Sequence, residues 1–165
     1  MWKYAPVNRA VRLFLWIAII ILWGTAIAKL STVLSHAPVI WKRDAVVGIK
    51  NEYVLAMAGV IELAIVLYSL ISNNTPRRLL VINFFALNIL AYHILRALSG
   101  FQGYGCPCLG AVPRYLPFSE HVWDRILFCA ALFLFLGSTI FLAVLMRKSG
   151  DEWETEDGKP SSSVR

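Results

Sequence analysis

The most reactive side chains that the sequence sets close together are two cysteines separated by one proline. Cys106 and Cys108 lie in the stretch 105–110, which has the sequence Gly-Cys-Pro-Cys-Leu-Gly. A disulfide across a single residue closes a small, strained ring, and strain and exposure make such a bond easier to reduce. The pair therefore indicates thiol–disulfide exchange, in which one thiolate attacks a partner disulfide and the other cysteine resolves the mixed disulfide.

Two other roles for this cysteine pair remain open. A plain disulfide would shape the loop without turning over, although a bond that closes so short a loop stabilises little. A metal site would need two more ligands, and His121 is the only nearby candidate on the loop. The third cysteine, Cys129, lies in an apolar stretch, and we expect it to be a small buried hydrophobic side chain rather than a third redox thiol.

A second candidate site is an acidic residue inside a long apolar run. Glu62 lies near the middle of the run 53–72. A carboxylate at mid-bilayer is costly, so it should face the protein interior and have a partner, or be protonated. We expect partners on the third apolar run, where Tyr92 and Arg96 share a helix face beside His93. This arrangement predicts a quinone or proton site formed by Glu62, Tyr92 and Arg96, or else a polar clamp between helices.

The composition places these residues in a membrane protein. The chain of 165 residues is 58% hydrophobic and 16% charged, and its mean hydropathy is +0.63. Soluble domains carry roughly a quarter charged residues, whereas long uncharged runs mark membrane spans. The formal net charge of +6 does not indicate nucleic-acid binding, because the basic residues lie at the ends of apolar runs, where they anchor and orient a membrane protein.

Four apolar runs predict an all-α fold, a transmembrane four-helix bundle with up-down-up-down topology and two longer loops on its outer face. The expected spans are about 11–30, 53–72, 79–98 and 126–146, and residues 149–165 are expected to be a disordered polar tail. Lys29, at the end of the first run, should snorkel to the membrane surface. Small residues should let the helices approach closely; they are Gly24, Ala56, Gly59, Ala86 and Gly137.

The first span has an alternative interpretation as a signal peptide, with an Ala-x-Ala cleavage site at 26–28. We favour a retained span because the run is long and rich in Ile and Trp. Equal numbers of Lys and Arg fall on the two faces, but those on the side of the termini are packed into shorter segments. We therefore expect both termini in the cytoplasm of a bacterial inner membrane, with the Cys106 loop outside, where disulfides persist.

The chain resembles the MauE/DoxX group of redox-associated membrane proteins. The resemblance rests on the end of the first span at 26–30, on Glu62, on the Cys-x-Cys-Leu-Gly motif at 106–110, and on Asp124 before the fourth span. It implies disulfide exchange with a periplasmic thioredoxin-fold partner, or a small subunit linked to sulfur-compound oxidation and quinone.

The number of cysteine pairs limits what this resemblance implies. Vitamin K epoxide reductase-like enzymes pass electrons to quinone with two cysteine pairs, and this chain has one. An electron acceptor must then contact Cys106 and Cys108 directly, or come with a partner. The alternative is a non-catalytic membrane subunit or scaffold for a partner oxidoreductase complex, with a structural Cys106–Cys108 disulfide.

Overall fold

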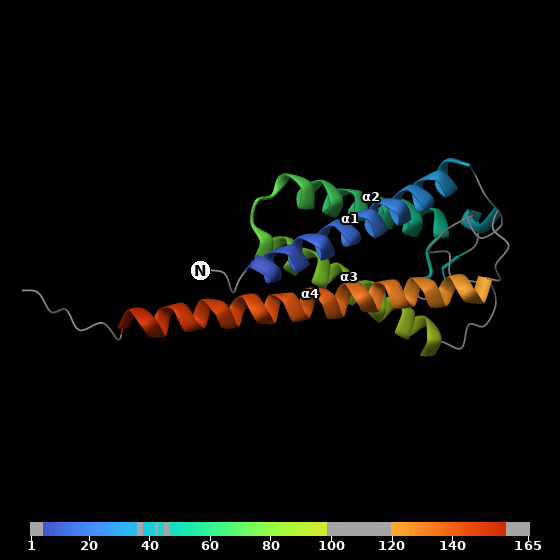
Figure 1. The fold of residues 1–165 in the computed structure, drawn as a ribbon. Helices are drawn as coiled ribbons and strands as arrows, with labels where there is room; N and C mark the ends of the chain where they lie inside the picture. The colour runs from blue at the N-terminus through green and yellow to red at the C-terminus, as the bar shows by residue number, and fades with distance from the viewer. Residues whose placement is uncertain (1–4, 36–37, 42, 45–46, 99–119, 158–165) are drawn as a thin grey trace, which may run out of the picture.

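The computed structural model describes residues 5–35, 38–41, 43–44, 47–98 and 120–157. Its elements are four long helices, α1 (Ala5–Leu34), α2 (Asn51–Ile71), α3 (Thr75–Leu98) and α4 (Glu120–Asp157), and a short 3-10 helix, η1 (Pro38–Trp41). No sheet strand occurs within these ranges. The four helices run alternately in opposite directions (Figure 1). The predicted all-α, up-down-up-down four-helix bundle is thereby confirmed.

Each of the four helices contains a stretch that is long and apolar enough to cross a membrane. These stretches are Arg9–Leu34, Asn51–Ile71, Thr75–Leu98 and Arg125–Arg147. About 20 helical residues cross the hydrocarbon core of a bilayer. The outside of the bundle is also apolar, and Trp16, Ile20 and Trp23 of α1 are each more than half exposed. Lipid suits such a surface and water does not, so the chain is a multi-pass membrane protein.

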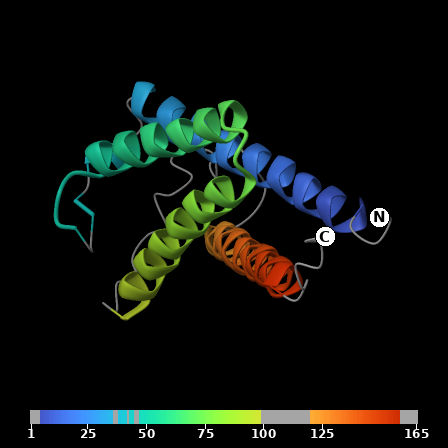
Figure 2. The ribbon, with the colours of Figure 1, turned by 90° about the vertical axis from the view of Figure 1, so that its left-hand side faces the viewer.

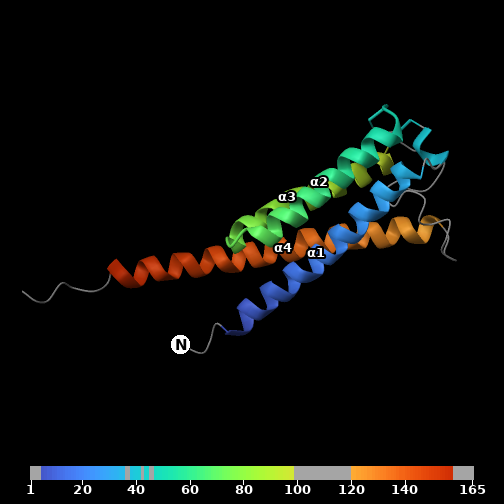
Figure 3. The ribbon, with the colours of Figure 1, turned by 90° about the horizontal axis from the view of Figure 1, so that it is seen from above.

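Different helices begin and finish at the two ends of the bundle. At the loop end, α1 and α3 finish, α2 and α4 begin, and η1 is found (Figures 1 and 3). At the opposite end, which we call the termini end, α1 begins and α4 finishes. A short turn there joins α2 to α3, and the Asn74 side chain caps α3 by accepting a hydrogen bond of 3.2 Å from the Arg77 amide.

The helices associate as two tight pairs, α1 with α2 and α3 with α4 (Figure 2). Glycine allows the first contact, because a Cβ atom at Gly59 would lie 3.0 Å from Leu30 Cγ and 3.4 Å from Lys29 Cβ. A polar contact supports the second, since the Asn83 amide of α3 donates a hydrogen bond of 3.0 Å to Ser138 Oγ of α4.

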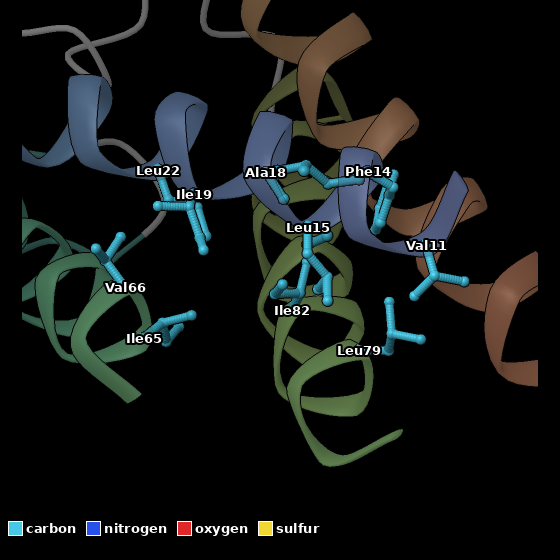
Figure 4. Close-up of a cluster of buried hydrophobic side chains, with 12 residues drawn as sticks. Val11, Phe14, Leu15, Ala18, Ile19, Leu22, Ile65, Val66, Leu79 and Ile82 are labelled. Carbon is cyan, nitrogen blue, oxygen red and sulfur yellow. The ribbon is translucent and has the colours of Figure 1, made fainter. Parts of the chain in front are cut away.

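The apolar core joins the two pairs in the half of the bundle nearer the termini end. Figure 4 shows α1 side chains facing those of α2 and α3; the labelled members are Val11, Phe14, Leu15, Ala18, Ile19, Leu22, Ile65, Val66, Leu79 and Ile82. The Phe14 ring lies on Gly137 of α4, where a Cβ atom would overlap it. Because lipid is as apolar as these side chains, close packing rather than water exclusion holds such a core together.

Two local expectations differ from the structure. Gly24 does not lie at a helix contact, because it is exposed on the outside of α1 and a Cβ atom there would have no neighbour within 4 Å. Residues 149–157, which were expected to form part of a disordered tail, continue α4 as helix to Asp157. Extending an existing helix adds one hydrogen bond per residue, so a polar continuation of a long apolar helix needs no new nucleation. Residues 158–165 lie outside the described ranges.

Candidate functional site

A buried ion pair links α1 to α2. Lys29 Nζ donates a hydrogen bond to Glu62 Oε1, and the two side chains are 8% and 1% exposed. The prediction that Glu62 has its partner on the third span is wrong, as is the prediction that Lys29 snorkels to the surface. The reason is the length of α1, which continues to Leu34 and so keeps Lys29 within the helix, where the close approach at Gly59 brings it against α2.

Burial of this ion pair in an apolar interior costs free energy. The effective desolvation penalty is several kcal/mol for each buried ion, and replacing a buried pair by well-packed apolar side chains is often neutral or stabilising. Stability alone therefore does not account for Lys29 and Glu62. Ionisable residues within membrane spans are rare and usually mark a site or pathway for a substrate, an ion or a proton.

The pair borders a cavity of about 210 Å³ between the four helices. An apolar cavity of roughly 150 Å³ is large enough to hold benzene, so this one can hold a six-membered ring with substituents. Small-molecule sites typically have apolar walls and a few polar groups that orient the ligand. Here the walls are mainly aliphatic and aromatic, and the polar lining residues are Thr25, Lys29, Glu62, Asn88, Tyr92 and His93.

The cavity occupies the half of the bundle nearer the loop end. Glu62 lies eleven residues after the start of α2, which places it about 16 Å from that end at 1.5 Å per residue. Tyr92 lies six residues before the end of α3, at about 9 Å. With a hydrocarbon core of about 30 Å, Glu62 is near mid-membrane and Tyr92 is nearer the surface.

The second oxygen of the Glu62 carboxylate has no hydrogen-bond partner within the described ranges. This atom, Oε2, is buried. The Thr25 hydroxyl of α1 interacts with the carboxylate and also lies 3.1 Å from the main-chain oxygens of Ile21 and Leu22, between which its single hydrogen can be shared. A buried acceptor without a donor costs about 1–3 kcal/mol. One oxygen thus holds Lys29, and the other is enclosed by the surrounding side chains.

A second polar contact fastens a turn of the chain to α3 beside this cavity. The Tyr92 hydroxyl donates a hydrogen bond of 2.6 Å to Asp44 Oδ2, and the Val47 amide donates one of 2.9 Å to Oδ1. The turn closes with a hydrogen bond of 2.7 Å from the Asp44 amide to the Ile49 carbonyl, and Gly48 has a φ of +73°. Asp44 was not predicted as a site residue, although an aspartate shortly before a glycine is a turn signal.

The other predicted site residues are placed differently. His93 lines the cavity and its ring packs edge-on against Phe128 at a centroid distance of 6.1 Å. Arg96, one turn nearer the loop end, does not line the cavity. Of the three predicted ligand-site residues, the structure brings Glu62 and Tyr92 to one cavity and leaves Arg96 outside it.

The cysteines fall into two groups. Cys106 and Cys108 lie in 99–119, outside the described residues, so their predicted exchange chemistry stays a prediction. Cys129 is exposed on α4, and the prediction that it is buried is wrong. In an uninterrupted apolar helix the sequence does not tell which side faces lipid, because both sides are apolar.

Comparison with known proteins identifies no relative. No family model matches the chain, and no curated protein and no solved structure matches it either. The resemblance to the MauE/DoxX group remains a prediction from the motifs.

Proposed function

We propose that this protein is a membrane redox protein in which Cys106 and Cys108 pass electrons from a thioredoxin-fold partner to a quinone. The observation that carries the proposal is the cavity of about 210 Å³, because it combines ring-sized apolar space with the buried Lys29–Glu62 pair. Quinones are lipid-soluble rings with oxygen atoms at two edges. Such a ligand needs apolar walls and a polar end, which is the usual composition of a small-molecule site.

The proposed reaction balances without a further reactant. A partner dithiol reduces the Cys106–Cys108 disulfide through a mixed disulfide, and the partner leaves oxidised. Oxidation of the Cys106 and Cys108 thiols back to the disulfide then releases two electrons and two protons. A quinone takes up both electrons and both protons and becomes a hydroquinone.

The topology supports a connection between the cysteines and the cavity. The segment with Cys106 and Cys108 leaves α3 at Leu98 and joins α4 at Glu120, and both of these helix ends lie at the loop end. The cavity occupies the same half of the bundle, and Tyr92 and His93 are its lining residues nearest that end of α3. In the proposed orientation the loop end faces the periplasm of a bacterial inner membrane, where disulfides persist, and both termini are cytoplasmic.

The test is turnover in a reconstituted membrane. The full chain in nanodiscs is supplied with reduced thioredoxin as the probe donor and a short-chain ubiquinone, and the loss of quinone absorbance is followed. We expect donor-dependent quinone reduction that is abolished by Cys106→Ser and by Cys108→Ser. Cys129→Ser is the matched control and should turn over at the wild-type rate. Wild-type rates in both loop variants would contradict the proposal.

Trapping in intact cells separates this function from a scaffold role. One of Cys106→Ser and Cys108→Ser should accumulate a mixed disulfide with the partner, and the other should not, because only one cysteine attacks. A scaffold subunit predicts instead that neither variant traps a partner and that both keep their function.

A further inference from the structure

A turn at the loop end places two basic side chains next to each other. Arg43 and Lys50 pair as an isolated antiparallel bridge, and beside them the Asp44 amide donates a hydrogen bond of 2.7 Å to the Ile49 carbonyl. This bond makes Arg43 and Lys50 a non-hydrogen-bonded pair, whose side chains lie on one face with Cβ atoms about 4.5–5.5 Å apart. The backbone therefore holds two positive charges side by side.

Neither of these charges is neutralised by a carboxylate within the described part of the chain. Arg43 and Lys50 are exposed, and neither forms an ion pair there. The carboxylate of the adjacent Asp44 is buried and accepts hydrogen bonds from the Tyr92 hydroxyl and the Val47 amide. Like charges directly opposite each other destabilise a strand pair. An anion bound against both side chains removes that repulsion.

The turn is fastened to the bundle on both sides. Tyr92 of α3 donates to Asp44 at 2.6 Å, and η1 packs on α2 with Ile40 fully buried. Lys50 is also the N-cap residue of α2, and its Nζ lies 5.8 Å from the centroid of the Trp41 ring, within the range of a cation–π contact. The two charges are thus positioned before a ligand arrives, which lowers the entropic cost of binding.

The place of the turn indicates the source of the anion. Lys50 immediately precedes the membrane-crossing stretch Asn51–Ile71, so the pair lies at the membrane surface. The neighbouring side chains of Trp41, Val47 and Ile49 are exposed and apolar. Basic groups beside exposed aromatic and aliphatic side chains suit the headgroup region of a bilayer, where phosphates lie next to acyl chains. A dissolved anion would leave these apolar side chains in water.

We propose that Arg43 and Lys50 bind the phosphate of an anionic phospholipid, and that Trp41 and Ile49 lie in the bilayer interface beside it. Guanidinium and ammonium groups donate charge-assisted hydrogen bonds to phosphate oxygens. The site is separate from the cavity, because none of these four residues lines it. It therefore stands or falls independently of the redox function.

Lipid binding to the full chain in a neutral detergent tests the proposal. Phosphatidylglycerol and phosphatidylcholine with the same acyl chains are titrated separately, and bound lipid is measured by native mass spectrometry. Each basic residue near the surface strengthens binding to anionic lipid about fivefold. Arg43→Gln/Lys50→Gln should therefore bind phosphatidylglycerol at least about tenfold more weakly and phosphatidylcholine within about twofold of the wild type. Equal affinity of the wild type for the two lipids overturns the proposal.

Two further double variants separate the site from net charge and from folding. Arg9→Gln/Arg12→Gln removes the same charge from exposed positions near the start of α1 and should keep the wild-type affinity for phosphatidylglycerol. Arg43→Lys/Lys50→Arg keeps both charges and should bind within about threefold of the wild type. Equal losses in the two glutamine variants overturn the proposal, and so does a full loss in the variant that keeps the charges.

Hydrogen exchange in the wild type covers the case in which the variants do not fold. The amides of Asp44 and Gly48 are hydrogen-bonded within the turn. Phosphatidylglycerol in the nanodisc should slow their exchange at least about twofold relative to phosphatidylcholine alone, because the bound phosphate removes the repulsion across the turn. Inorganic phosphate added to phosphatidylcholine nanodiscs should have no such effect. Unchanged exchange with phosphatidylglycerol, or equal slowing by inorganic phosphate, overturns the assignment to a lipid.

Discussion

The two halves of this bundle are built on different principles. Towards the termini end, apolar side chains from α1, α2, α3 and α4 fill the interior, and the Phe14 ring packs against Phe133 and Phe141 at centroid distances of 5.5 and 5.3 Å. Towards the loop end, the same four helices surround a cavity that is lined by Lys29, Glu62 and Tyr92. One half is packed closely, and the other keeps a cavity and buried charge.

The difference separates stability from function. Close packing gives a membrane bundle most of its cohesion, because lipid does not drive apolar helices together as water does. A cavity forfeits such contacts, and a buried ion pair adds a desolvation cost. We infer that the packed half holds the helices in place while the half with the cavity is kept for a ligand.

The largest effect is expected when one member of the ion pair is removed. Lys29→Met or Glu62→Met leaves a buried charge without its partner, which should lower the free energy of unfolding by about 3–5 kcal/mol. Unfolding of the detergent-solubilised protein measures this loss. The double variant Lys29→Met/Glu62→Met should recover to within about 1 kcal/mol of the wild type, since apolar replacement of both partners is often neutral. A double variant as unstable as the single ones would show that the pair is structural.

Gly137→Ala should affect stability alone. The added Cβ atom meets the Phe14 ring, so one of the two helices must shift, at a cost of about 1–3 kcal/mol. Ligand binding should stay within about twofold of the wild type, because Gly137 does not line the cavity. A large loss of binding in a folded Gly137→Ala protein would show that the two halves are coupled.

Tyr92→Phe should loosen the turn at the loop end by about 1 kcal/mol, the net value of an ordinary hydrogen bond. The variant removes the hydroxyl that donates to Asp44 Oδ2, while Asp44 Oδ1 still accepts from the Val47 amide. Hydrogen exchange is the measurement, and the Val47 amide should exchange about fivefold faster. Unchanged exchange would mean that Tyr92 does not hold the turn.

Cys129→Ser should have the smallest effect. Its side chain is exposed on α4, and substitutions away from special contacts usually change stability by less than about 0.5 kcal/mol. Thermal unfolding and quinone turnover should both match the wild type. A marked loss of either would reveal a contact that the isolated chain does not make.

The sequence predicted the bundle because four long apolar runs leave few alternatives in a membrane. It also pointed to Glu62, since a mid-span acid is conspicuous. It did not predict Lys29 as the partner, because a lysine near the end of an apolar run is usually expected at the surface. The continuation of α1 to Leu34, through residues that resemble a loop start, reverses that expectation.

The glycines show a similar limit to what the sequence can predict. Gly24 and Gly59 both lie within apolar spans, yet one faces outward and the other allows α1 to contact α2. In spans that are apolar on every side, no polar stripe marks which face is buried. The helix that each span packs against, and therefore the set of residues that line the cavity, could be learned only from the three-dimensional structure.

The most direct test of a ligand site at the buried ion pair is binding by the double variant Lys29→Met/Glu62→Met. Its dissociation constant for a short-chain ubiquinol in nanodiscs is compared with that of the wild type, after unfolding has shown the two proteins to be similarly stable. We predict a folded protein whose affinity for the ubiquinol has fallen at least about tenfold. Wild-type affinity in the double variant would contradict a ligand site built on this pair.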